Sequence, residues 1–361
     1  MSRLSLALPP PAVLWFTAAL LALGALGGEV AKLVHAPLPW MLGSLAISAL
    51  IVSFLPARLP VGYRFPNLLR ISFIAIIGVM IGARVDRALL SQWPDMVISL
   101  AGITLFVFLA HGANYWLFRR IGGYGRATAF YCATPGGVME SIAFGEAAGA
   151  DVRLLTLQQF LRIILVVTTV PIGLSLLHGA PMGSAAGLNF GSDDTRLAAI
   201  PLVLIVAAAG VALGRAARLP AGQLTGPLVL AAAANVLGVV ELNPPGWLLA
   251  VAQVVIGVSL GVRFLGVTRA MLRLALGLSV ASVTMMLALG LGFAATIHAI
   301  TGQSSEVLVL SFAPGGVTEM GLVALSLAAN PAMVAFHHLY RISLTVLEMS
   351  ILGRWLAMSD D

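Results

Sequence analysis

Two glutamates follow Pro-Gly-Gly triplets inside apolar sequence, and their setting is the one that most favours chemistry. The first stretch reads Pro-Gly-Gly-Val-Met-Glu and the second Pro-Gly-Gly-Val-Thr-Glu. A carboxylate surrounded by apolar sequence is costly, and such groups usually handle an ion, a proton or a solute. The alternative is that each glutamate caps a helix that begins after the triplet. The candidate substrate-binding or ion-binding residues are therefore Pro135, Gly136, Gly137, Glu140, Pro314, Gly315, Gly316 and Glu319.

A basic residue follows each glutamate at the same separation along the chain. Arg162 follows Glu140, and Arg341 follows Glu319. The repeated spacing allows an ion pair between each arginine and its glutamate, binding of an anion by the guanidinium groups, or snorkelling of the side chains. The sequence leaves all three open.

Two histidines, His337 and His338, stand where the first half of the chain has Gln158 and Gln159. Imidazole titrates near neutral pH, so either histidine could shuttle protons, and a hydrogen-bonded packing role is the alternative. Glu348 is a weaker candidate for a proton relay. These differences predict a binding region whose two halves are chemically unequal.

The candidate residues belong to a duplicated unit. The offset between the two glutamates also relates Gly78 to Gly257, Gly82 to Gly261 and Arg84 to Arg263. In the first segments, an offset seven residues larger relates Gly24 to Gly210, Gly28 to Gly214 and Lys32 to Arg218. This difference places a deletion in the loop after the second segment of the second copy. The sequence predicts a first repeat over residues 1–178, a polar linker over 179–196 and a second repeat over 197–361.

Composition places this duplicated unit in a membrane. The 361 residues are 60% hydrophobic and 9% charged, with a mean hydropathy of +1.01, whereas soluble proteins are about a quarter charged. The basic residues are scattered between apolar runs, so the expected partner is the lipid bilayer and not nucleic acid. The apolar segments, whose lengths suit membrane spans, are 12–33, 38–56, 67–83, 94–118, 127–148, 154–178, 198–217, 220–240, 246–264, 272–299, 305–328 and 332–356.

The distribution of arginine and lysine predicts that the two repeats are inverted. In the first repeat the loops after the second and fourth segments are the more basic, and in the second repeat those after the first and third. Because basic loops face the cytoplasm, homologous loops face opposite sides, which requires an odd number of spans per repeat. We therefore predict an all-α polytopic protein of the bacterial inner membrane with five spans in each repeat, a broken or re-entrant Pro-Gly-Gly segment, and both termini cytoplasmic.

The Pro-Gly-Gly-Val-x-x-Glu elements, the Ile-Gly-Val-x-x-Gly-x-Arg elements and the duplication resemble the AbrB membrane protein family. That family was named for a proposed role as a regulator of aidB, is unrelated to the like-named DNA-binding regulator, and is often labelled ammonia monooxygenase. The resemblance implies an integral membrane protein that is transporter-like. It supplies no catalytic residues to carry over.

Three functions follow from these observations. Transport of a small organic solute, expected to be an anion moved with a proton or sodium ion, is the prediction, with alternating access around the paired breaks. A membrane sensor that affects gene expression would need a partner, because both tails are short. A monooxygenase would need a redox metal, yet none of the six histidines forms an i, i+4 pair. We expect no enzyme activity, no metal and no cofactor, and a homodimer is left open.

Overall fold

The computed structural model describes residues 9–85, 93–179, 199–239, 242, 244–327 and 329–358. Every regular element in these ranges is a helix, as the sequence predicts. The predicted linker lies outside them except for Gly179, which ends the preceding helix with a left-handed φ of 66°.

The two halves of the chain contain the same order of helices. The first half forms α1 (Pro11–Leu33), α2 (Pro39–Phe54), α3 (Asn67–Gly82), α5 (Trp93–Trp116), α6 (Arg126–Ala133), α7 (Val138–Ala147) and α8 (Val152–His178). The second half forms α9 (Ala199–Ala216), α10 (Gly222–Val236), α11 (Trp247–Gly261), α12 (Arg269–Thr301), α13 (Ser305–Phe312), α14 (Val317–Ser326) and α15 (Pro331–Met358). Short 3-10 turns follow α2 and α11, and a π turn follows α5.

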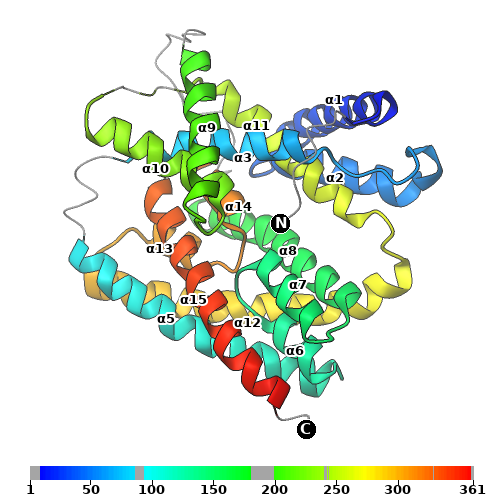
Figure 1. Cartoon of the computed structure of the whole chain (residues 1–361), viewed down its shortest axis with the longest axis vertical. Helices are drawn as coiled ribbons and strands as arrows, with labels where there is room; N and C mark the ends of the chain where they lie inside the picture. Colours follow the sequence, from blue (N-terminus) through cyan, green and yellow to red (C-terminus); the bar gives the residue numbers. More distant parts are fainter. Residues whose placement is uncertain are drawn as a thin grey trace.

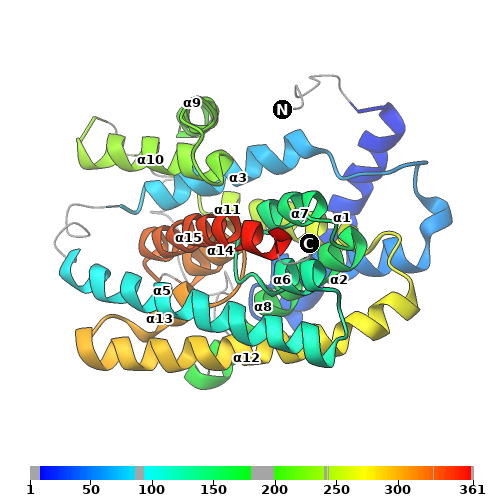
Figure 2. The same ribbon diagram turned by 60° about the horizontal axis from the view of Figure 1, so that its bottom comes forward.

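The helices form two bundles, and each half of the chain contributes to both. The first bundle contains α1, α2, α3, α9, α10 and α11, and the second contains α5 to α8 and α12 to α15 (Figure 1). In the first bundle α2 packs on α11 and α3 packs on α10, so the same contact is made twice with the halves exchanged. Figure 2 shows α9 and α10 on one side of the molecule and α12 on the opposite side.

Glycines bring the helices of the first bundle into backbone contact. Gly27 of α1 faces Gly43 of α2, and Gly210 of α9 faces Gly226 of α10. A Cβ at any of these positions would overlap with the facing backbone. Small residues allow such close approach between membrane helices. Because Gly27 and Gly210 make equivalent contacts, they are structural counterparts in the two halves.

The Gly-x-x-x-Gly pairs at the ends of α3 and α11 also make close contacts in the first bundle. Gly78 and Gly82 lie against the backbone of α10, whereas Gly257 and Gly261 lie against α2. The interpretation of these pairs as helix-packing residues is confirmed.

The left-handed turns before α2 and α10 correct the predicted alignment of the first segments. His35 and Leu38 have φ angles of 55° and 46°, and Arg218 and Ala221 have 52° and 47°. His35 and Arg218 are separated by the same offset as Gly27 and Gly210, and so are Leu38 and Ala221. The predicted alignment, which pairs Gly24 with Gly210, is therefore wrong by three residues, nearly one helical turn.

Helical periodicity explains this error. Small residues that recur at helical spacing match at several offsets that differ by about a turn, and only the backbone geometry selects one. With this corrected alignment, the deletion in the loop after the second segment of the second copy is four residues long. The later segments keep the smaller offset, the one that relates the two glutamates.

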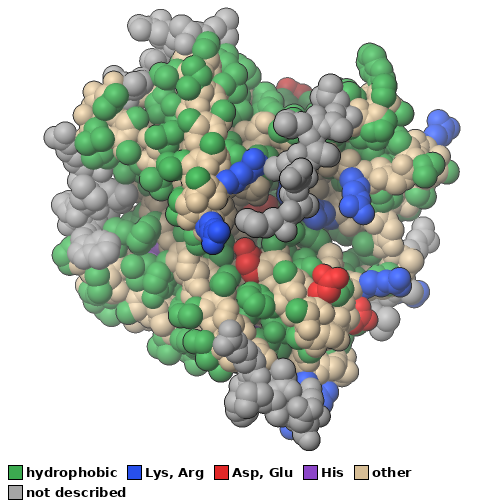
Figure 3. All heavy atoms as spheres, viewed as in Figure 1, with side chains coloured by type: hydrophobic (Ala, Val, Ile, Leu, Met, Phe, Trp, Pro, Cys, Tyr) green, Lys and Arg blue, Asp and Glu red, His purple; other side chains and the backbone are tan. Residues whose placement is uncertain are grey.

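The surface of the molecule is apolar. Six helices in the described part of the chain are long and apolar enough to cross a membrane, and α2, α3 and α14 are shorter apolar helices. Trp15 of α1 and Leu176 of α8 are each 78% exposed. On the face in Figure 3, hydrophobic side chains cover most of the surface and the charged ones gather toward the middle and right. These long apolar helices and exposed apolar side chains are those of an integral membrane protein.

Replacing Gly210 by alanine should destabilise the first bundle. The added Cβ would overlap with the backbone of α10, and such overpacking costs about 1–3 kcal/mol. Thermal unfolding in detergent should give a lower Tm for Gly210→Ala. Gly112→Ala is the control, because Gly112 is exposed near the end of α5 and its Cβ would meet nothing within 4 Å. Equal Tm values for the two variants would contradict the close packing of α9 on α10.

Candidate functional site

Both Pro-Gly-Gly triplets lie between two helices. Helix α6 ends at Ala133 and α7 begins at Val138, while α13 ends at Phe312 and α14 begins at Val317. Proline removes an amide donor and disrupts a helix interior, and glycine weakens it further. As a result α7 and α14 start inside the molecule, where their first amide groups carry the positive end of the helix dipole.

The N-termini of α7 and α14 open onto one cavity of about 240 Å³. Residues of α3, α10 and α11 in the first bundle line one side of it, and residues of α7, α8 and α14 line the other. The cavity therefore lies between the bundles. The predicted site residues that line it are Gly137, Glu140, Arg162, Gly315, Gly316 and Glu319. The structure places Pro135, Gly136, Pro314, His337, His338 and Arg341 outside this lining.

Three arginines share the cavity with the two glutamates. Arg162 comes from α8, Arg70 from the start of α3 and Arg263 from the turn after α11. Arg70 and Arg263 interact electrostatically with Glu319. Neither was a predicted site residue. The repeated Ile-Gly-Val-x-x-Gly-x-Arg element ends at Arg263 and was the signal that could have selected it.

The ion-pair interpretation of the repeated arginines is wrong. Among the ion pairs of the described residues, none joins Glu140 to Arg162 or Glu319 to Arg341. A constant sequence spacing shows that two residues recur together, but it does not show where their side chains point. Both arginines point toward the ends of the first half-helices.

Each buried arginine binds a carbonyl group that the helix break leaves without an intrahelical donor. A terminal nitrogen of Arg162 donates to the carbonyl oxygen of Thr134, just after α6, and Arg341 Nη1 donates to that of Ala313 at 2.6 Å, just after α13. Arg341 Nη2 also donates to Gly315 at 2.8 Å. The last carbonyls of a helix have no partner within it, and a buried carbonyl needs a donor. The arginines therefore stabilise the breaks.

The side chains of Gln159 and His338 bind the same helix ends. Gln159 Nε2 donates to the carbonyl oxygen of Tyr131 at 2.8 Å, and His338 Nε2 lies 2.9 Å from that of Leu310. Arg341 Nη2 lies 2.8 Å from His338 Nδ1. Because a guanidinium group can only donate, Nδ1 accepts and Nε2 carries the hydrogen. His338 is therefore a neutral imidazole that donates to the end of α13.

His337 is hydrogen-bonded on both ring nitrogens. Its Nε2 lies 2.7 Å from the Ser99 hydroxyl, and its Nδ1 lies 2.7 Å from the Met333 carbonyl oxygen. These contacts support the packing alternative for His337. In the part of the chain that the structure describes, no three His, Cys, Asp or Glu side chains are grouped so that they could hold a metal ion.

Arg162 leaves two donors unused. Its Nε and Nη2 have no hydrogen-bond partner although the side chain is only 4% exposed, whereas Arg341 leaves only Nε unpaired. Arg162 also lines the cavity. A buried charge without partners is unfavourable, and charge-assisted hydrogen bonds to an anion are strong. Arg162 is therefore a lining residue whose side chain keeps buried donors without a partner.

Each glutamate folds back over the glycine before its helix. An oxygen of Glu319 occupies the place of a Cβ on Gly316, and Glu140 Oε2 lies 3.4 Å from the place of a Cβ on Gly137. The carboxylates thus lie at the positive ends of α14 and α7. This geometry is compatible both with helix capping and with ion handling, the two roles that the sequence allows.

Alanine at Gly137 should destabilise the protein while alanine at Gly136 should not. Gly137 has a φ of 62°, a left-handed conformation that costs other residues about 1–2 kcal/mol. A Cβ on Gly136 would have its nearest neighbours at 3.5 Å, an ordinary contact. Thermal unfolding of the two variants in detergent checks this difference, and a lower Tm for Gly136→Ala than for Gly137→Ala would contradict the geometry of the first break.

Comparisons with known proteins match this chain over most of its length. The sequence pattern of a family described as "Transition state regulatory protein AbrB" matches residues 50–357. The chain is 27% identical over 355 residues to "Uncharacterized protein YhjN" of Bacillus subtilis (strain 168), covering 92% of this chain and 90% of that protein. It is 26% identical over 312 residues to "Putative regulator AbrB" of Escherichia coli (strain K12), covering 83% and 85% of the two chains.

Proposed function

Because the chain belongs to the AbrB family and is an integral membrane protein, we propose that it is a secondary transporter of a small organic anion, coupled to a proton or a sodium ion. The observation that carries this proposal is the cavity between the two bundles, toward which both interrupted segments direct helix N-termini. Interrupted helices at a central solute site are typical of secondary transporters.

The charges around the cavity favour an organic anion. Two helix N-termini, the unpaired nitrogens of Arg162 and the side chains of Arg70 and Arg263 are all attractive to a negative group. The remaining lining is largely apolar, with residues such as Ile74, Val138, Phe160, Ile256, Leu260 and Ile342. A small carboxylate with an apolar body matches this lining. A cation that enters with it would be attracted to the two glutamates.

Alternating access requires two bodies that move against each other, and the bundles supply them. The cavity lies between them, so relative movement could open it first to one side of the membrane and then to the other. The exchanged contacts of α2 with α11 and of α3 with α10 support a two-fold relation between the halves. With the charge pattern of the loops, this relation favours inverted repeats of five spans each, in the inner membrane with both termini cytoplasmic.

The inverted arrangement predicts that homologous loops lie on opposite sides of the membrane. Cys132 is the single cysteine, so Cys132→Ser, which introduces the residue found at the homologous position Ser311, gives a background without thiols. In that background Ala57→Cys, in the loop after α2, should react with an impermeant maleimide only from the cytoplasmic side. Val239→Cys, in the loop after α10, should react only from the outside. Both positions are exposed. Labelling of both from one side would contradict inversion.

Arg162→Gln should lower transport of small carboxylates strongly. The substitution removes the charge that faces the cavity, and a hydrogen bond to a charged group is worth about 1.5–3 kcal/mol, which corresponds to roughly a 10-fold to 100-fold loss. The measurement is uptake of radiolabelled acetate, lactate, succinate and citrate by proteoliposomes, with Tm as the check of folding. Arg153→Gln, an exposed arginine in the first turn of the same helix, is the matched control and should transport normally.

Two glutamate variants complete this test of the cavity. Glu140→Gln and Glu319→Gln keep the size of the side chains and remove their charge. Uptake that stays unchanged in Arg162→Gln, Glu140→Gln and Glu319→Gln would remove the cavity from the transport mechanism.

A further inference from the structure

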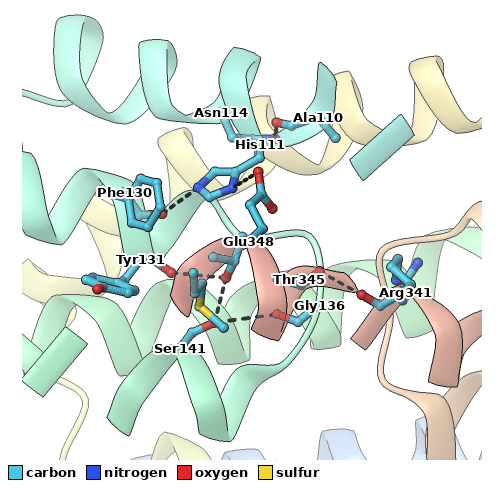
Figure 4. A network of polar contacts seen from close by, with 12 residues as sticks. Ala110, His111, Asn114, Phe130, Tyr131, Gly136, Ser141, Arg341, Thr345 and Glu348 are labelled. Atoms are coloured by element: carbon cyan, nitrogen blue, oxygen red, sulfur yellow. Dashed lines mark hydrogen bonds and ion pairs between the residues drawn. The ribbon is translucent and has the colours of Figure 1, made fainter. Parts of the chain in front are cut away.

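We propose that His111 and Glu348 form the proton-binding site of this transporter, an inference that rests on the proposed transport function. His111 comes from α5 and Glu348 from α15, and His111 Nδ1 lies 2.9 Å from Glu348 Oε1 (Figure 4). Each side chain is only 3% exposed. The pair lies outside the lining of the solute cavity, so it is a separate site.

The contacts of His111 define how many protons the pair holds. Its Nε2 lies 3.0 Å from the carbonyl oxygen of Phe130, which can only accept, so Nε2 carries a hydrogen. Nδ1 lies 2.9 Å from Glu348 Oε1 without meeting hydrogen-bond geometry, but two unprotonated acceptor atoms this close in a buried site would repel each other, so we assign one further proton to the pair. That proton gives either an imidazolium with a carboxylate or a neutral imidazole with a carboxylic acid. Both forms have zero net charge, which suits a buried location.

Only one oxygen of the Glu348 carboxylate has a polar contact among the described residues. Its Oε2 is buried and has no hydrogen-bond partner among the described residues. Without the shared proton, an ionised carboxylate would face the lone pair of Nδ1 with no compensating donor. A conformation that admits water or another donor to Glu348 Oε2 would connect the pair to solvent. A buried pair that solvent reaches in only one conformation is what coupling of a proton to transport requires.

The pair lies beside the first helix break: His111 contacts the helix before it, and the neighbour of Glu348 along α15 contacts the helix after it. Phe130, which accepts from His111, lies in the last turns of α6. Met349, next to Glu348, accepts a hydrogen bond at 3.6 Å from the Ser141 hydroxyl in the first turn of α7. Figure 4 shows the pair beside this break. Protonation of the pair is therefore positioned to influence the half-helix that carries Glu140 to the cavity.

The two halves of the chain differ at this site. Thr169, the residue of α8 that corresponds to Glu348, is exposed and donates to the Leu165 carbonyl oxygen of its own helix. One such pair per chain would give one coupled proton per transport cycle at this site. Thr169 also provides a control position that should be indifferent to protons.

Other titratable groups occur on the elements around the pair, but none of those described forms an ion pair with it. They include Asp95 and Tyr115 on α5, Arg126, Tyr131 and Cys132 on α6, Glu140 and Glu146 on α7, and His337, His338, Tyr340 and Arg341 on α15. From α12 comes Ser282, which donates to Asn114 of α5 and is uncharged. The shared proton is therefore assigned to His111 and Glu348.

The test separates proton coupling from solute movement. Proteoliposomes with the full chain are given an inward pH gradient, and accumulation of the radiolabelled carboxylates is compared with counterflow exchange at equal pH. In Glu348→Gln and in His111→Gln, accumulation should fall to the level seen without a gradient while counterflow persists. Thr169→Ala should keep both activities. Gradient-driven accumulation that persists in folded Glu348→Gln and His111→Gln would overturn the proposal.

A second measurement does not depend on transport. Infrared difference spectra of the purified protein, recorded across an acid-to-alkaline titration, should contain a carboxyl band that is lost in Glu348→Gln and shifted in His111→Gln. Spectra in which neither substitution changes any carboxyl band would overturn the proposal. If the wild-type protein moves none of the carboxylates and yet shows this band, the transport function fails while the proton site stands.

Discussion

The constraint on which the rest of this structure depends is the need to give hydrogen-bond partners to backbone groups at two helix breaks in an apolar protein. In lipid, irregular backbone is tolerated only where protein or a wet cavity satisfies it. Arg162 and Arg341 donate to equivalent carbonyls after α6 and α13, and Gln159 and His338 donate one turn earlier. The free amides of the following half-helices are left to face the cavity. The side chains thus stabilise the helix ends before each break, while the helix starts after each break line the cavity.

The two helix breaks have the same arrangement of helices but differ in the side-chain contacts around them. The carbonyl-binding contacts recur in both halves, which explains why arginine stands at the same place in each. Other features do not recur: Gly137 is left-handed with a φ of 62°, whereas Gly316 is extended with a φ of −76°. Arg341 uses its second terminal nitrogen on Gly315 and His338, while that of Arg162 stays free. The second terminal nitrogen of Arg341 is therefore used in hydrogen bonds within the protein, whereas that of Arg162 has no partner.

The sequence predicts most of the fold because its signals are local. Apolar runs bounded by proline place the helices within a few residues, and the Pro-Gly-Gly triplets place both interruptions. The predicted alignment of the first segments was wrong because helical periodicity makes alignments one turn apart nearly equivalent. The left-handed turns at His35 and Arg218 decide between these alignments, and they are seen only in the backbone of the folded chain.

The site was harder to predict because its contacts depend on tertiary packing. The ion-pair interpretation was wrong because Arg162 and Arg341 bind backbone carbonyl groups. A pattern of side-chain types does not show which backbone carbonyls will lie beside an arginine. Arg70 and Arg263 were not predicted as site residues because their approach to Glu319 depends on how the two bundles pack.

The packing also indicates which parts can move together. Backbone contacts between glycines, such as Gly27 with Gly43 and Gly210 with Gly226, join the helices of the first bundle along their lengths. Contacts between the bundles are fewer and run mainly through α3, α11, α14 and α15. If the second bundle moves against the first, it carries both half-helix N-termini, Arg162 and the pair of His111 with Glu348 as one unit, whereas Arg70 and Arg263 stay behind. Solute and proton would then change their exposure in the same step, because the groups that bind them are fixed to the same body.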